Sequence, residues 1–234
     1  MHKLSIVIPC YNEASNISKL IDKLEKIQSN EIEIILVDNG STDETAQLIN
    51  NILVNRNFFK FITIPKNIGY GNGIMHGVKK AIGNVISWTH ADLQTDPSDV
   101  INAYSYFIKN PDYKMCVLKG KRIGRNIFDR IFTFGMSALS SLLIRIKLSD
   151  INAQPKMFHR SFLDKLTNAP DDFSLDLYFL YKAKINNYLV LEYPVYFNKR
   201  LHGLAKGGGT IKGKWRLIKR TWTYMHTLKN NIEN

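Results

Sequence analysis

The chain has 234 residues, 44% of them hydrophobic, and a formal net charge of +12, so it can bury the core of one large domain, with or without an appendage. Its two cysteines, Cys10 and Cys116, lie in predicted buried strands without a CxxC pattern, which argues against a disulfide framework and favours reduced thiols in the cytosol. No run of 18 apolar residues could span a membrane, and the apolar run at residues 4–10 is too short for a signal peptide.

Predicted strands and helices alternate through the first half of the chain. Short apolar runs rich in β-branched and aromatic residues predict strands at residues 4–9, 33–37, 59–64 and 85–89. Helices are predicted over 13–28 with Asn12 as N-cap, from Ser41 or Thr42, from the glycine stretch 67–73 through residue 82, and from Pro97. This order predicts an α/β fold with a mostly parallel, doubly wound sheet and helices on both faces.

The second half of the chain is less regular. Strands are predicted at residues 115–118, 151–158 and 189–197, and helices at 127–146, 161–166 and 174–186. The first of these strands is expected to be followed by a basic cluster, Lys119, Lys121, Arg122 and Arg125. The glycine- and lysine-rich residues 201–213 are a candidate mobile lid, and a last helix is predicted from residue 214.

Acidic or glycine-containing turns follow three of the predicted strands. These turns are Tyr11-Asn12-Glu13, Asp38-Asn39-Gly40 and His90-Ala91-Asp92. In a parallel sheet they converge on the edge where open α/β sheets bind their ligands. Asp92 offers oxygen ligands suited to Mg²⁺ or Mn²⁺ on a phosphate, or it merely caps its turn. Three such turns in register favour the ligand site.

Three glycines, Gly69, Gly71 and Gly73, suggest a dinucleotide-binding loop at first sight. They follow the third predicted strand rather than the first, and they lack the GxGxxG spacing. A tight turn with close backbone approach is the better interpretation.

Four segments together resemble family 2 glycosyltransferases of the GT-A fold, and among these the dolichol- and polyprenyl-phosphate sugar synthases. The segments are residues 7–13 (VIPCYNE), 37–43 (VDNGSTD), 67–77 and 91–94 (ADLQ). The resemblance covers roughly residues 3–206. It implies a Rossmann-like GT-A fold, a UDP- or GDP-linked sugar donor, Mg²⁺ or Mn²⁺, and transfer with inversion at the anomeric carbon to a polyprenyl-phosphate or glycan acceptor.

The resemblance also implies roles for individual residues. The residues that would bind the nucleotide sugar are Pro9, Tyr11, Glu13, Asp38, His90, Ala91, Asp92, Gln94, Arg200 and Lys206. Asp92 and Gln94 would hold the metal, which offsets the charge of the leaving diphosphate. Arg122 and Arg130 would hold an acceptor phosphate.

Asp176 is implied as a second catalytic residue. It would act as general base if the acceptor is a sugar hydroxyl, whereas a lipid phosphate is already anionic and needs no strong base. Asp171 and Asp172 compete for this role, but both also suit the capping of the following helix.

The sequence departs from the family pattern at three places. His90 stands where the metal motif normally has a first Asp, Asn39 replaces a common second Asp, and Gln154-Pro155 stands where lipid-phosphate synthases usually have Ser-Gly.

Positive charge is concentrated in the second half of the chain. Residues 1–118 have 11 Lys/Arg and 12 Asp/Glu, whereas residues 119–234 have 21 and 8. Near the end, apolar Trp215, Ile218, Trp222 and Met225 recur at helical spacing among basic residues. This pattern predicts a basic amphipathic helix that lies on an anionic membrane surface through residues 212–229, or alternatively packs on the domain. Nucleic acid is not expected as the partner, because no recognised binding motif occurs.

The resulting hypothesis is a metal-dependent inverting glycosyltransferase of cell-surface glycan synthesis, cytoplasmic and peripheral on the inner membrane face. Its GT-A domain would span residues 1–210, with a nucleotide-sugar half at 1–118 and an acceptor half at 119–210, followed by the helix at 211–234. The alternatives are a catalytically weak sugar-nucleotide-binding or scaffold protein, motivated by His90, and a basic nucleic-acid-binding domain.

Overall fold

The structure is a computed structural model that describes residues 3–54, 56–124, 146, 148–198, 219 and 222–225. Seven strands of the described chain form one sheet in the order β3-β2-β1-β4-β6-β5-β7. Their bounds are β1 Leu4–Cys10, β2 Ile32–Asn39, β3 Phe59–Ile64, β4 Val85–Trp88, β5 Cys116–Ile123, β6 Lys156–His159 and β7 Leu189–Tyr196. All neighbouring pairs are parallel except those of β6, which runs antiparallel to β4 and β5.

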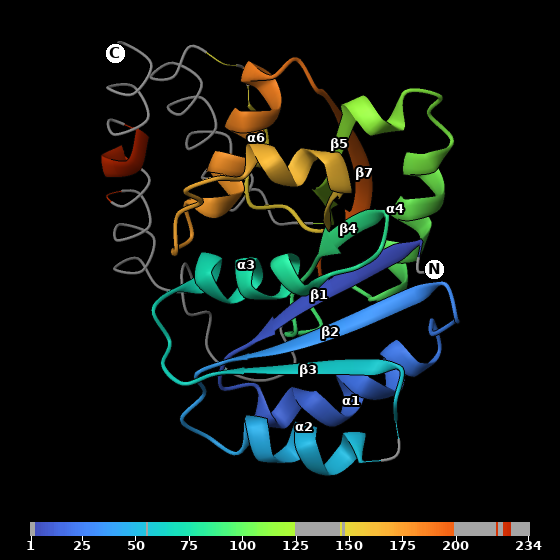
Figure 1. Cartoon of the computed structure of the whole chain (residues 1–234), viewed down its shortest axis with the longest axis vertical. Helices are drawn as coiled ribbons and strands as arrows, with labels where there is room; N and C mark the ends of the chain where they lie inside the picture. The colour runs from blue at the N-terminus through green and yellow to red at the C-terminus, as the bar shows by residue number, and fades with distance from the viewer. Residues whose placement is uncertain are drawn as a thin grey trace.

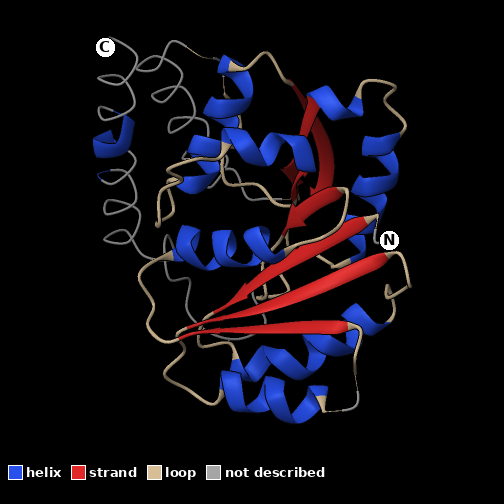
Figure 2. Ribbon diagram, viewed as in Figure 1, coloured by secondary structure: helices blue, strands red, loops and turns tan. Residues whose placement is uncertain are grey.

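Helices cover both faces of the sheet (Figures 1 and 2). The α-helices are α1 Ala14–Glu25, α2 Thr45–Leu53, α3 Tyr70–Lys80, α4 Ser98–Ile108 and α6 Leu175–Ile185, and the 3-10 helices are η1 Tyr113–Met115 and η2 Arg160–Lys165. One buried cluster joins α3 and α6 to the sheet, and a second cluster joins α1, α2 and α4 to the opposite face.

The two clusters follow from alternation along the buried strands. In β1, Val7 packs toward α3 and α6, whereas Ile6 and Ile8 pack toward the α1 face. Because successive side chains of a strand point to opposite faces, a continuous apolar run is what a strand covered on both faces requires. The predicted mostly parallel α/β sheet, covered on both faces, is therefore confirmed.

The first four predicted strands are confirmed with small shifts at their ends, but three other predictions need correction. The strand predicted at 115–118 extends to Ile123, so the basic residues Lys119 to Arg122 lie within β5 and do not follow it. The strand predicted from residue 151 begins only at Lys156, because a turn at Asp150, whose φ is +36°, precedes it. The helix predicted at 161–166 is the 3-10 helix η2.

Asn12 does not cap α1. It adopts φ +52° and its side-chain Oδ1 accepts a hydrogen bond from the Thr42 backbone N–H at 2.8 Å, so the amide is turned across to the second strand-end turn. Glu13 occupies the N-cap position without a side-chain cap. The predicted helix at 127–146 lies outside the described residues except for Ile146.

Candidate functional site

The three predicted turns meet at the carboxyl edge of the sheet (Figure 1). Cys10 at the end of β1 pairs with Asp38 at the end of β2, and the Thr89 backbone N–H donates to the Val7 carbonyl on the other side of β1 at 3.1 Å. The first two turns are also joined directly, since the Glu13 backbone N–H donates to Thr45 Oγ1 at 2.8 Å. The strand register thus brings these turns together.

Asp38 and Asn39 close β2 and are almost completely buried. Asp38 Oδ1 accepts from the Ser41 backbone N–H at 3.2 Å, which shapes the turn. Asn39 Nδ2 donates to the Gly69 carbonyl at 2.9 Å, so it ties the second turn to the glycine stretch. Pro9, Tyr11 and Glu13 line the neighbouring end of β1 and are half-buried. The edge therefore offers polar side chains that the fold already holds in place.

Asp92 lies just beyond β4 and is 5% exposed. Its Oδ1 accepts from the Gln94 backbone N–H at 3.1 Å, so it does shape its own turn. Gln94 Nε2 donates to the Asn198 carbonyl at 3.2 Å, which leaves Oε1 as its only atom able to bind a metal. Ala91 is buried against the α1 face, and His90 is half-buried with its ring 5.9 Å from that of Tyr70.

A divalent metal fits this turn as the partner of a phosphate. Among the described residues, no group of three His, Cys, Asp or Glu side chains is arranged to hold a metal ion. Mg²⁺ is commonly bound through one or two carboxylates with the remaining ligands from substrate phosphates and water. Asp92, a carboxylate at a strand end, matches that pattern, with the diphosphate of a nucleotide as the second source of ligands.

The glycine stretch provides close packing, as the sequence suggests. A Cβ at Gly71 would lie 2.1 Å from the Pro170 carbonyl oxygen, and one at Gly69, whose φ is +153°, would lie 2.1 Å from the Asp171 carbonyl oxygen. The Asn72 backbone N–H donates to that Asp171 carbonyl at 2.9 Å. The glycines therefore allow the segment 170–173 to lie against the start of α3.

On the acceptor side, Asp176 is in the first turn of α6 and only 2% exposed. Gln154 Nε2 donates to its Oδ1 at 3.0 Å and also contacts the Tyr70 hydroxyl at 3.0 Å. Lys156 Nζ lies 3.2 Å from Asp176 Oδ1. A general base must reach the proton that it removes, so the role predicted for Asp176 stays a prediction.

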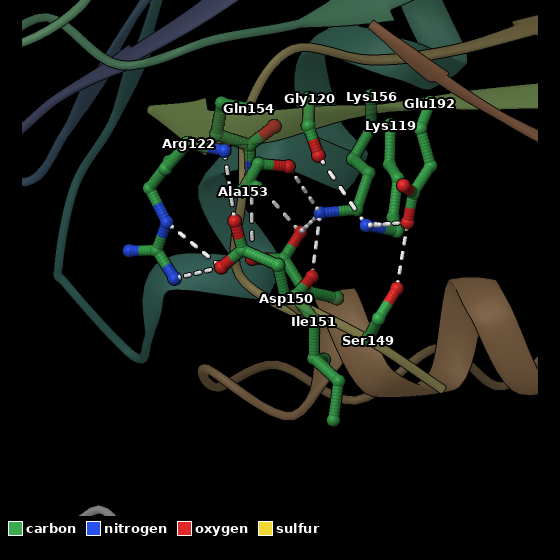
Figure 3. A network of polar contacts seen from close by, with 11 residues as sticks. Lys119, Gly120, Arg122, Ser149, Asp150, Ile151, Ala153, Gln154, Lys156 and Glu192 are labelled. Carbon is green, nitrogen blue, oxygen red and sulfur yellow. Dashed lines mark hydrogen bonds and ion pairs between the residues drawn. The ribbon is translucent and has the colours of Figure 1, made fainter. Parts of the chain in front are cut away.

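Lys156 is fully buried, and the sequence reasoning assigned no role to it. Besides the ion pair with Asp176, its ammonium donates to the Ile151 and Ala153 carbonyls, both at 2.8 Å (Figure 3). Burial lowers the pKa of Lys156 to about 8, although Asp176 opposes the shift. A lysine inside a predicted buried strand was the signal that could have revealed this contact, because buried charges are paired.

The hydroxyl of Tyr70 also lies in this region. Burial raises the pKa of Tyr70 well above its usual value, and the charges of Asp176 and Asp92 raise it further. The phenol therefore stays protonated and lies within the field of both carboxylates.

The basic residues of β5 are already paired (Figure 3). Arg122 Nε donates to Asp150 Oδ1 at 2.9 Å and its backbone N–H donates to Asp150 Oδ2 at 2.9 Å. Lys119, 2% exposed, lies 2.9 Å from Glu192. An acceptor phosphate at Arg122 would therefore have to compete with Asp150, and the predicted role of Arg122 stays a prediction.

Several predicted residues lie outside the described part of the chain. They are Arg130, Arg200, Lys206 and most of residues 212–229. Within the described part of the tail, Met225 is fully buried against the α6 cluster and Trp222 is 40% exposed. At Met225, at least, the apolar stripe packs on the domain. No described helix has the length and apolarity to cross a bilayer.

Comparison with known proteins identifies the family. The family model described as Glycosyl transferase family 2 matches residues 5–167. Over 104 residues, the chain is 33% identical to an undecaprenyl-phosphate 4-deoxy-4-formamido-L-arabinose transferase of Enterobacter sp. (strain 638), covering 43% of this chain and 32% of that protein. The corresponding protein of Pseudomonas fluorescens (strain Pf0-1) is 36% identical over the same length, with 31% of it covered. The chain thus spans about a third of the length of these relatives.

Solved structures share the fold at low sequence identity. Glucosyl-3-phosphoglycerate synthase from Mycobacterium tuberculosis, solved with Mn²⁺, UDP and glucosyl-3-phosphoglycerate, has a TM-score of 0.73 and 14% identity, with 94% of this chain and 77% of that chain covered. Mannosyltransferase PcManGT from Pyrobaculum calidifontis, solved with GDP-Man and Mn²⁺, has a TM-score of 0.69 and 19% identity, with 99% and 64% covered.

Proposed function

The chain belongs to glycosyl transferase family 2, and from this we propose that it transfers a sugar from a nucleoside-diphosphate donor, with inversion, to a polyprenyl-phosphate or glycan acceptor. The observation that carries the proposal is the placement of Asp38 and Asp92 at the same carboxyl edge of the sheet, after β2 and β4, which both pair with β1; each is almost completely buried and each shapes its turn. That edge is where open α/β sheets bind nucleotides.

In this proposal the two turns divide the donor between them. The end of β2, with Asp38, would hold the nucleoside, and Asp92, with Gln94 Oε1, would face the diphosphate. Bound Mg²⁺ or Mn²⁺ would supply charge neutralisation for the leaving diphosphate. The Mn²⁺ in the neighbours' structures supports this cofactor but does not choose between the two metals.

The reaction breaks the bond between the anomeric carbon and the diphosphate oxygen as an acceptor oxygen forms its own bond to that carbon from the opposite side. The nucleoside diphosphate leaves with the electron pair of the broken bond. A phosphate acceptor enters as an anion and loses no proton, whereas a hydroxyl acceptor must give its proton to a base, for which Asp176 is the candidate.

The acceptor is proposed from the relatives and from charge. The undecaprenyl-phosphate transferases match this chain over only 104 residues. They nevertheless favour a lipid phosphate as the acceptor. The excess of Lys and Arg after residue 118 favours an anionic partner. We therefore propose that the protein acts at the inner face of the membrane, with the positive charge after residue 118 attracted to anionic lipid.

The test is transfer itself. Purified protein with Mn²⁺ is supplied with UDP- or GDP-sugars, together with vesicles that contain polyprenyl phosphate or with a soluble glycan, and both nucleoside diphosphate and glycosylated product are measured. The proposal expects equal amounts of the two products for one donor and one acceptor.

A second candidate is a sugar-nucleotide-binding protein with weak catalysis. It is favoured by His90, which leaves Asp92 as the single carboxylate of its turn. Donor binding without any glycosylated product, with every acceptor class tried, would support this candidate against the transferase.

A further inference from the structure

Tyr70, the first residue of α3, is not among the residues that the sequence singled out. Its ring stacks on Phe173 with centroids 4.7 Å apart and planes 8° from parallel, and lies 5.9 Å from the His90 ring. The close approach of segment 170–173 to Gly69 and Gly71 makes this stack possible. The ring is therefore fixed from both sides.

The Tyr70 hydroxyl is oriented by a chain of contacts that begins at Lys156. The Lys156 ammonium uses its three hydrogens on the Ile151 carbonyl, the Ala153 carbonyl and Asp176. The Asp176 carboxylate is thereby held against the Gln154 amide nitrogen, 3.0 Å from its Oδ1. Lys156, Asp176 and Gln154 are all almost completely buried.

The Gln154 amide cannot reverse. An ionised carboxylate only accepts hydrogen bonds, so the nitrogen of Gln154, not its oxygen, must face Asp176. The same nitrogen lies 3.0 Å from the Tyr70 hydroxyl, which makes the hydroxyl oxygen an acceptor from Gln154. The Tyr70 hydroxyl hydrogen must then point away from Gln154.

Tyr70 contacts residues of both halves of the proposed site. Its ring lies 5.9 Å from that of His90, two residues before Asp92 on the donor side. Its hydroxyl lies 3.0 Å from Gln154 Nε2, which also donates to Asp176 on the acceptor side. The group that occupies the space between a donor diphosphate and an acceptor is the sugar in transit. Resting on the proposed function, we propose that Tyr70 determines donor specificity by donating its hydroxyl hydrogen to an oxygen of the transferred sugar.

Tyr70→Phe tests this proposal, because it removes the hydroxyl and keeps the ring that stacks on Phe173. Calorimetry measures the Kd of wild type and variant, with Mn²⁺, for the nucleoside diphosphate that wild type binds and for the matching nucleotide sugar. A single neutral hydrogen bond predicts nucleotide-sugar binding about 3- to 10-fold weaker in the variant, with the Kd for the nucleoside diphosphate unchanged within about twofold.

Two further variants complete the test. Tyr104→Phe, on α4 at the opposite face, is the matched control and should change neither Kd. Gln154→Met removes the amide that orients the hydroxyl, so it should weaken nucleotide-sugar binding selectively, as Tyr70→Phe does. This variant keeps the inference testable if Tyr70→Phe does not fold.

The outcomes separate the inference from the proposed function. Equal affinities of wild type and Tyr70→Phe for the nucleotide sugar would overturn the role of Tyr70 alone. An equal loss for the sugar-bearing and sugar-free nucleotides would also overturn it, because the hydroxyl would then serve the diphosphate or the fold. If wild type binds no nucleotide sugar of any kind, the proposed function and the inference both fail.

Discussion

Replacement of Lys156 by methionine removes one half of a buried ion pair. The variant loses the 3.2 Å contact with Asp176 and the two 2.8 Å hydrogen bonds to the Ile151 and Ala153 carbonyls. Asp176, 2% exposed, is then buried without its counter-ion, and among the described residues Gln154 is the side chain that still donates to it. Removing one partner of a buried ion pair costs about 3–5 kcal/mol. This cost exceeds the free energy gained because the ammonium no longer has to be buried.

For a chain of this length, that cost lowers the midpoint of thermal unfolding by about 6–20 °C. Urea unfolding at pH 7, followed by tryptophan fluorescence, measures the free energy directly. Asp176→Leu should show a comparable loss, since it leaves the ammonium of Lys156 unpaired. The double variant Lys156→Met/Asp176→Leu replaces both charges and should be more stable than either single variant.

Additive losses would contradict the coupling of Lys156 and Asp176. If the double variant loses the sum of the two single losses, Lys156 and Asp176 do not depend on each other energetically. A loss below about 1 kcal/mol for Lys156→Met would likewise show that the ammonium is not paired as described.

Three further predictions concern packing and pH. Gly71→Ala, whose Cβ would lie 2.1 Å from the Pro170 carbonyl oxygen, should lower the free energy of unfolding in urea by about 1–3 kcal/mol. Lys79→Ala, on the exposed side of α3, should lower it by less than about 0.5 kcal/mol. The pKa of Lys156 is lowered from 10.5 to about 8. Between these pH values the folded state binds fewer protons than the unfolded state, so wild-type stability should rise from about pH 8 to 10.5. The rise should be smaller in Lys156→Met. Burial opposes ionisation of Glu192, but its contacts with Ser149 and Lys119 lower its pKa from 4.5 to about 2. The stability that Glu192 provides above pH 4.5 should therefore be lost as the pH falls toward 2, and Glu192→Gln should show a smaller loss. Identical dependence of stability on acid pH in wild type and Glu192→Gln would contradict this.

The donor half was predictable because its signals are local. Apolar runs predicted β1 to β4, and polar residues directly after three of them indicated the carboxyl edge. The error at Asn12 was also local in origin. Its residue type suits an N-cap, but with φ +52° its side chain reaches Thr42 on a neighbouring turn, and the one-dimensional pattern does not contain that contact.

The acceptor half depends on contacts between distant parts of the chain. Tyr70 and Gln154 are 84 positions apart and meet only because α3 and the segment before β6 lie on the same face of the sheet. The resemblance implied a phosphate-binding role for Arg122, and the strand was expected to end at residue 118, before it. Its place inside β5, paired with Asp150, came from the tertiary structure.

The central claim, a nucleotide-sugar site built on Asp92, is tested most directly by nucleotide binding. Calorimetry with UDP and GDP, each with and without Mn²⁺, compares wild type with Asp92→Asn and with Asp112→Asn, an exposed carboxylate before η1, as the control. The account predicts that one nucleotide binds wild type and the control more tightly with Mn²⁺, and that Asp92→Asn loses this gain. An equal gain from Mn²⁺ in Asp92→Asn, or no binding of either nucleotide to wild type, would contradict it.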